Sequence, residues 1–173
     1  MRFTASKIYV TTYEKYNNGT LKGTYLDPQD YYDRDDFLEA CQELHKDEES
    51  PEFMYTVYPE IGGLITESSI DSKLWDVLAL SPNEREIVEV YSSVYSIKEK
   101  SIERILGSFE GTFDSHSDFA EEHHYTHNLD QVRATEALGL VIDWHQTFLS
   151  DMRHVYLDVK HNEENWYFNI YNE

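Results

Sequence analysis

Residues 7–27 read KIYVTTYEKYNNGTLKGTYLD, and their pattern indicates how the N-terminal part folds. Two β-like runs, 7–13 and 20–26, flank Asn17-Asn18-Gly19. Glycine adopts the positive φ that a hairpin turn needs, and asparagine and glycine are the residues that such turns favour. The stretch therefore predicts an antiparallel β-hairpin.

The residues that follow extend this hairpin to a ββαβ unit over 1–65. Residues 53–58 (FMYTVY) are typical of a third strand, and 33–46 have the periodicity of an amphipathic helix. At 100° per residue, the apolar residues of this helix fall on one side and its acids on the other: Phe37, Leu38, Cys41 and Leu44 against Asp36, Glu39, Glu43 and Asp47. The unit is therefore expected to have an acidic outer face.

Residues 66–107 are expected to form a central helical subdomain. Ser81-Pro82-Asn83-Glu84 combines an N-cap, a proline in the first turn and a capping-box glutamate, and Ser96-Ile97-Lys98-Glu99 repeats the capping-box pattern. A shorter helix is predicted near 74–78. Ile102, Ile105 and Leu106 form an apolar stripe that stops near Gly107.

Residues 108–173 are predicted to be a mixed helix and sheet subdomain. It should begin with a polar stretch and continue with helices near 117–127, 130–138 and 142–150, with Gly139 as the cap of the second. Two alternating strands close the chain, joined by the polar turn 161–165. One face of each strand is apolar, formed by Val155, Leu157 and Val159 and by Trp166, Phe168 and Ile170. The fold class expected for the whole chain is α+β.

The charge is the main functional signal. The 173 residues include 34 Asp and Glu against 14 Lys and Arg, a formal net charge of −20, and yet 14% are aromatic. Disordered acidic tails lack such aromatic content, so the chain is expected to fold despite its self-repulsion. The sign of the charge disfavours direct binding to nucleic acid or to an anionic membrane. Basic proteins or cations are the expected partners.

Sixteen acids are candidate partner-binding residues because they recur in clusters on predicted helix faces. They are Asp33, Asp35, Asp36, Glu39, Glu43, Asp47, Glu48, Glu49, Glu84, Glu86, Glu89, Glu99, Glu103, Asp118, Glu121 and Glu122. The helix over 33–46 places its carboxylates roughly 5 Å apart, which approaches the charge spacing of one DNA strand. Solvated helix faces, or a surface of the kind found in halophiles, are the alternative explanations.

A metal site is the competing hypothesis. His116, His123, His124 and His127 cluster beside acids, and an i, i+4 histidine pair places two imidazoles on one helix face. No HExxH motif accompanies them. An EF-hand starting at Asp33 fails because Leu38 and Leu44 occupy its sixth and twelfth positions.

Nothing in the sequence argues for catalysis. It contains no G-x-S-x-G, P-loop or G-x-G-x-x-G motif, so neither catalytic residues nor a cofactor is expected. The single cysteine, Cys41, cannot form an intramolecular disulfide and suits a reducing cytoplasm. We find no signal peptide and no apolar run of the roughly 18–20 residues that a membrane span needs.

The N-terminal stretch carries a more specific pattern. Ile8-Tyr9-Val10 is followed by Tyr16-Asn17-Asn18-Gly19 and then by 21–27, LKGTYLD, with its glycine, aromatic residue and aspartate. This pattern resembles the opening of the ArdA family of antirestriction proteins, and Ile142-Asp143-Trp144 is similar to the C-terminal part of that family.

The resemblance implies an elongated, three-part, non-enzymatic protein that forms a homodimer through its C-terminal part. It implies that the carboxylates imitate bent duplex DNA and occupy the DNA groove in the methyltransferase core of type I restriction–modification enzymes. Such proteins are carried by mobile genetic elements and act in the cytoplasm of the bacterial host cell.

The resulting hypothesis is a stoichiometric inhibitor that mimics DNA. A dimer would carry twice the −20 of one chain, the charge of roughly 70 Å of duplex, or about 20 base pairs. Two alternatives stay open at the level of sequence: a metal-binding protein centred on His116–His127, and an acidic interaction module for another basic DNA-binding protein.

Overall fold

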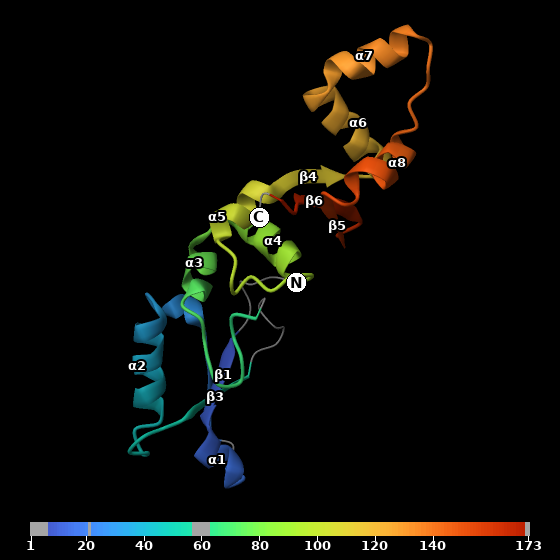
Figure 1. Cartoon of the computed structure of the whole chain (residues 1–173). Coiled ribbons are helices and arrows are strands. Elements are labelled where there is room, and N and C mark those ends of the chain that lie inside the picture. The colour runs from blue at the N-terminus through green and yellow to red at the C-terminus, as the bar shows by residue number, and fades with distance from the viewer. Residues whose placement is uncertain (1–6, 21, 57–62, 172–173) are drawn as a thin grey trace. The chain divides into compact units, whose positions relative to one another are not determined.

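The computed structural model describes residues 7–20, 22–56 and 63–171. The chain divides into two compact units, Met1–Ile102 (unit 1) and Glu103–Glu173 (unit 2). Each unit contains one small antiparallel sheet with helices, so the α+β class predicted from the sequence is confirmed (Figure 1). Among the described residues, no helix has both the length and the apolar character of a membrane span.

The sheet of unit 1 has the order β2-β1-β3 and consists of β1 (Ile8–Thr12), β2 (Thr24–Leu26) and β3 (Phe53–Thr56). The pairing predicted for the hairpin is confirmed, with Ile8 opposite Leu26. The last two residues of the predicted third strand, 57 and 58, lie outside the described residues.

The connection between β1 and β2 differs from the predicted tight turn. The helix α1 (Tyr13–Asn17) follows β1 directly, because the Thr12 hydroxyl accepts a hydrogen bond from the backbone N–H of Lys15 and caps it. Gly19 does have the expected positive φ, +67°. Gly23 is required for another reason: a Cβ there would lie 2.3 Å from the carbonyl oxygen of Val10.

The predicted amphipathic helix of unit 1 is α2 (Arg34–Leu44), which follows the short 3-10 turn η2 (Pro28–Asp30). Phe37 and Cys41 are fully buried, whereas Leu44 at the helix end is exposed. Burial raises the pKa of Cys41 to about 12, so its thiol stays protonated and unreactive at neutral pH.

Three helices complete the middle of the chain: α3 (Lys73–Ala79), α4 (Pro82–Ser92) and α5 (Ile102–Ser108). The capping box between Ser81 and Glu84 is confirmed at the start of α4. The second capping box is wrong, because residues 96–101 are a non-helical connection with a turn at 98–100, and the next helix begins at Ile102. The Lys73 ammonium donates to the carbonyl oxygens of residues 97, 98 and 100, which fixes this segment as a turn.

The sheet of unit 2 has the order β4-β6-β5 and consists of β4 (Phe109–Phe113), β5 (Tyr156–His161) and β6 (Glu164–Asn169). The first of these strands corrects the sequence analysis, which expected a polar stretch at this position. The turn between β5 and β6 is tighter than predicted: His161 pairs with Glu164, and Asn162 and Glu163 both have positive φ.

The helices that follow β4 in unit 2 agree with the prediction in number and place. They are α6 (His116–His127), α7 (Leu129–Ala137) and α8 (Trp144–Thr147), the last of which continues into the π-helical turn η3 (Phe148–Met152). Gly139 ends the α7 region with φ +71° and an N–H bond to the Glu136 carbonyl. Unit 2 has a mainly aromatic core, formed by Phe119, Ala120, Phe148, Met152, Tyr156 and Tyr167.

Candidate functional site

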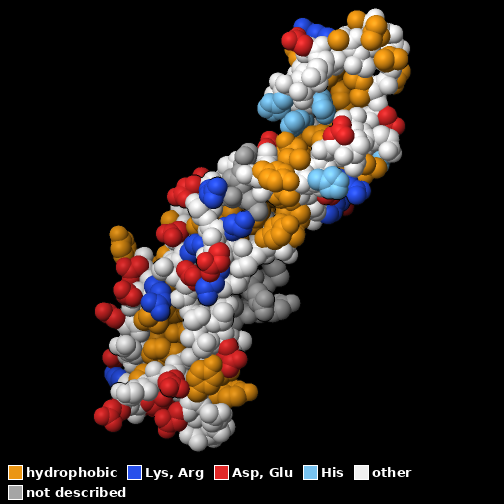
Figure 2. All heavy atoms as spheres, viewed as in Figure 1, with side chains coloured by type: hydrophobic (Ala, Val, Ile, Leu, Met, Phe, Trp, Pro, Cys, Tyr) orange, Lys and Arg blue, Asp and Glu red, His pale blue; other side chains and the backbone are white. Residues whose placement is uncertain are grey.

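The net negative charge is divided equally between the two units. Unit 1 has 20 acidic and 10 basic residues and unit 2 has 14 and 4, so each has a net charge of −10. On the face shown in Figure 2, Asp and Glu side chains gather over the N-terminal part of the chain, and histidines gather over α6. Each unit by itself therefore presents an acidic surface.

Most of the sixteen candidate acids face solvent. Four are half-buried: Glu48, Glu84, Glu86 and Glu89. The other twelve are exposed: Asp33, Asp35, Asp36, Glu39, Glu43, Asp47, Glu49, Glu99, Glu103, Asp118, Glu121 and Glu122. They come from α2 and its C-terminal turn, from the 96–101 connection, from α5 and from α6.

Three of these acids stabilise helix starts. The Asp33 carboxylate accepts hydrogen bonds from the backbone N–H groups of Asp35 and Asp36 at 2.9 and 3.0 Å. The Ser81 hydroxyl donates to Glu84 at 2.6 Å and lowers the pKa of that carboxyl group. The Ser115 hydroxyl donates a hydrogen bond to the Asp118 carboxylate at 2.6 Å. These acids therefore have structural roles in addition to their charge.

Two further acids surround a lysine in unit 1. The Lys15 ammonium lies 2.7 Å from Asp47, 3.1 Å from Glu48 and 2.9 Å from Nδ1 of His45. The Thr12 hydroxyl donates a 2.7 Å hydrogen bond to the Glu48 carboxylate. Burial alone lowers the pKa of Lys15, but the hydrogen bonds to both carboxylates outweigh burial and raise it.

These three ligand side chains, His45, Asp47 and Glu48, are the one set of metal-ligand type that converges among the described residues. Lys15 occupies the position between them that a metal ion would take. The arrangement is therefore an internal ion-pair network, which the sequence analysis did not foresee because Lys15 is 30 or more residues away from its partners.

Some of the remaining exposed acids have no partner among the described residues. Asp35, Glu39 and Glu43 follow one another at intervals of four residues along α2, which places them about 6 Å apart along the helix axis. Glu43 pairs with Lys46, but Glu39 makes no hydrogen bond or ion pair with any described residue. The same holds for Glu49, Glu99 and Glu122 within the described ranges.

The four histidines contact different partners. His116 is 3.1 Å from Asp158 and stacks on Phe148, whereas Nε2 of His123 lies 2.7 Å from the Tyr156 hydroxyl. Nδ1 of His124 is hydrogen-bonded to the Asn128 amide. No three ligand atoms of these side chains converge among the described residues. The i, i+4 spacing of His123 and His127 thus places two rings together, with centroids 4.6 Å apart, without making a coordination site.

We expect His123 to make the stability of unit 2 depend on pH. Burial lowers the pKa of His123, and the neighbouring His127 and His124 lower it further. His123 therefore binds a proton more readily in the unfolded chain than in the folded one. Its contribution to the free energy of unfolding is fully present above about pH 6.5 and is lost as the pH falls through the folded-state pKa. Urea unfolding from pH 7.5 to 5.5 should show a shallower decline for His123→Gln than for His154→Gln, an exposed control. Equal declines would contradict this prediction.

An exposed apolar segment follows α7. Leu138, Leu140 and Val141 are 77%, 59% and 96% exposed, and they lie between α7 and α8. Clustered exposed apolar side chains of this kind commonly mark a protein contact. The apolar run 138–142, LGLVI, is the sequence signal for this segment, although the predicted helices near 130–138 and 142–150 each take one end of it.

Comparison with known proteins identifies the family. A family model described as antirestriction protein (ArdA) matches residues 8–163, from β1 to the turn between β5 and β6. No curated protein and no solved structure matches the chain significantly. The family match includes the N-terminal pattern, the sheet of unit 1, the strands β4 and β5 of unit 2 and all the acidic helix faces. The chain therefore belongs to the ArdA family of antirestriction proteins.

Proposed function

We propose that this protein inhibits type I restriction–modification enzymes stoichiometrically, by placing its carboxylates in the DNA groove of the methyltransferase core. The observation that carries the proposal is the set of exposed acids without a partner among the described residues, Glu39, Glu49, Glu99 and Glu122, on two units of net charge −10 each. A DNA-binding groove offers the Lys and Arg side chains that such carboxylates attract.

The clustered acids destabilise the free protein, and binding to a basic groove would offset this cost. Like charges four residues apart on α2 destabilise the helix by a few tenths of a kcal/mol each, and a net charge of −20 opposes compaction. A basic groove relieves both effects on binding. Complementary charge also speeds association and makes it sensitive to salt.

The direct test is displacement. The protein is titrated into a type I restriction–modification enzyme bound to labelled duplex DNA, at low and at high salt. We expect release of the DNA near one protein dimer per DNA site, with weaker competition at high salt. If a large excess releases no DNA at either salt, this target is wrong, and capture of basic DNA-binding proteins would then test the interaction-module alternative.

We also propose a homodimer formed through unit 2, supported by the exposed apolar side chains of Leu138, Leu140 and Val141. Sedimentation should give twice the 20.5 kDa of one chain. Leu140→Ser should weaken dimerisation about tenfold, because burial of one leucine contributes about 1.5 kcal/mol. Val94→Ser, at a half-exposed valine of unit 1, is the control. An unchanged dimer in the Leu140 variant would remove this segment from the interface.

A further inference from the structure

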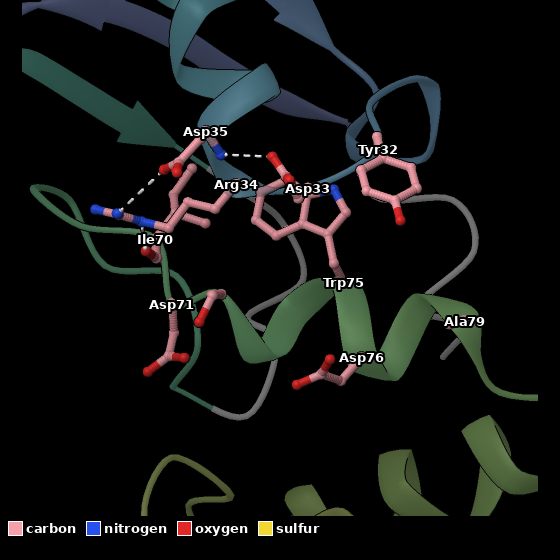
Figure 3. Close-up of a pocket in the computed structure, with 10 residues that line it drawn as sticks. Tyr32, Asp33, Arg34, Asp35, Ile70, Asp71, Trp75, Asp76 and Ala79 are labelled. Atoms are coloured by element: carbon pink, nitrogen blue, oxygen red, sulfur yellow. Dashed lines mark hydrogen bonds and ion pairs between the residues drawn. The ribbon is translucent and has the colours of Figure 1, made fainter.

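Unit 1 contains a groove that shares Asp33 and Asp35 with the candidate acids and adds aromatic side chains to them. Its volume is about 860 Å³, and it is bordered by the start of α2 on one side and by 70–79, which include α3, on the other. Figure 3 shows Trp75 pointing from α3 toward Arg34 and Asp33. The volume is in the range of about 300–1,000 Å³ that is common for ligand sites.

Two aromatic side chains, Tyr32 and Trp75, line the groove. Tyr32 is 90% exposed, although tyrosine usually buries most of its ring. The Trp75 indole N–H donates to the carbonyl oxygen of Tyr31 at 3.2 Å, and its ring packs on the buried Phe37 at 5.8 Å. The indole is therefore held in place while it lines the groove.

The charges in the groove are strongly unbalanced. Asp33, Asp35, Asp71 and Asp76 line it together with one cation, Arg34, so its net charge is −3. The Nε–H of Arg34 donates to the carbonyl oxygen of Ile70 at 2.8 Å, and its guanidinium is 3.9 Å from the Asp35 carboxylate.

Two of these carboxylates are open to a ligand. Asp76 makes no hydrogen bond or ion pair with a described residue. Asp71 uses one oxygen, Oδ1, to accept from the backbone N–H of Lys73 at 3.0 Å, and its other oxygen has no partner among the described residues.

We propose that this groove binds an arginine side chain of the partner protein. A planar guanidinium stacks on an aromatic face and at the same time donates to carboxylates, so an aromatic wall with a charge of −3 suits arginine better than a neutral or an anionic group. This inference rests on the proposed function, because it assumes a basic protein partner. It assigns to Tyr32, Trp75 and Asp76 a specific contact, in contrast to the replaceable charges of the α2 surface.

The test uses the full chain and a small probe, N-acetyl-L-arginine amide. The indole N–H signal of Trp75, assigned through Trp75→Phe, should shift with a saturable dissociation constant on the order of 1–10 mM. The uncharged analogue N-acetyl-L-citrulline amide should leave the signal in place. Absence of a saturable shift with the arginine probe, or equal shifts with the two probes, would overturn the proposal. An equal affinity for N-acetyl-L-lysine amide would overturn the assignment to arginine.

Matched variants locate the site. Tyr32→Ala and Asp76→Asn should each weaken binding of the arginine probe by about 2- to 5-fold. Two control variants should leave binding of the arginine probe unchanged. They are Tyr171→Ala, at a tyrosine that is 73% exposed, and Asp130→Asn, at an exposed aspartate on α7. The NMR spectrum of each variant shows whether it is folded. If all four behave alike, the arginine site is not in this groove.

The two proposals can fail separately. If the protein inhibits the restriction enzyme and Tyr32→Ala inhibits as strongly as Tyr171→Ala, the groove proposal fails and the proposed function stands. If the protein does not inhibit the enzyme at all, the proposed function fails, and the probe titration still decides whether the groove binds arginine.

Discussion

Phe119→Ala should lower the free energy of unfolding of unit 2 by about 3–5 kcal/mol, the range for removing a buried phenylalanine. Phe119 is 2% exposed and stacks on Tyr167, with ring centroids 4.0 Å apart and planes 13° apart. It also makes edge contacts with Phe113 and Tyr156 at 5.1 and 5.0 Å. Alanine would leave a cavity between the aromatic rings that now pack around Phe119 in the core of unit 2.

Urea unfolding monitored by near-UV circular dichroism measures this loss. Phe119→Leu, which keeps most of the apolar volume, should cost less than about 1.5 kcal/mol. Tyr171→Ala, at a tyrosine of unit 2 that is 73% exposed, is the control and should change stability by no more than about 0.5 kcal/mol. If Phe119→Ala behaved like the control, the packing of Tyr167 and Phe148 around this ring would not be the main support of unit 2.

The tryptophans report on the two units separately. Trp75 lies in unit 1, and Trp144 and Trp166 lie in unit 2. Because each unit has its own buried residues, Phe119→Ala should broaden or shift the indole signals of Trp144 and Trp166 and leave that of Trp75 in its native position. Simultaneous loss of all three signals would mean that the two units unfold as one.

Local patterns accounted for the elements that the sequence predicted well. The Ser81–Glu84 capping box, the apolar face of Phe37 and Cys41 and the cap at Gly139 each depend on residues within one or two helical turns. The missed strand β4 depends on a distant partner: Phe109 pairs with Phe168 in β6. Its sequence, FEGTF, is short and has a glycine at its centre, so its pairing partner rather than its composition makes it a strand.

The difference between local patterns and contacts of distant residues also applies to the candidate site. Composition indicated an acidic surface, and helix periodicity placed Glu39 and Glu43 on the exposed face of α2. Neither signal could show that Lys15 neutralises Asp47 and Glu48, or that Trp75 lines a groove with Tyr32, because these residues are more than 30 positions apart. Long-range packing decides which carboxylates are available to a partner.

Neutralising the four acids that lack a described partner should weaken inhibition of a restriction enzyme about 30-fold. The variant combines Glu39→Gln, Glu49→Gln, Glu99→Gln and Glu122→Gln. The proposed dimer carries each change twice, and eight exposed ion pairs of about 0.25 kcal/mol each sum to about 2 kcal/mol, which corresponds to this factor. The inhibition constant, measured at several salt concentrations, should also depend less on salt, because fewer charge pairs form.

The matched control keeps every charge: Glu→Asp at the same four positions should inhibit nearly as well as the original protein. A DNA mimic is further expected to lose affinity gradually, because each carboxylate replaces one phosphate among many. An ordinary protein interface instead concentrates its affinity in a few hot-spot residues. If one of the four single Glu→Gln changes accounted for the whole loss, the surface would be acting as such an interface and not as a mimic.

Unfolding of the quadruple variant cannot explain the expected loss of inhibition, because the four substitutions should stabilise the protein. Removing four negative charges from a chain of net charge −20 reduces self-repulsion, and none of the four carboxylates makes a hydrogen bond or ion pair with a described residue. The quadruple Gln variant should therefore be at least as stable toward urea as the original protein while it inhibits less. Higher stability together with weaker inhibition would indicate that these carboxylates serve the partner and not the fold.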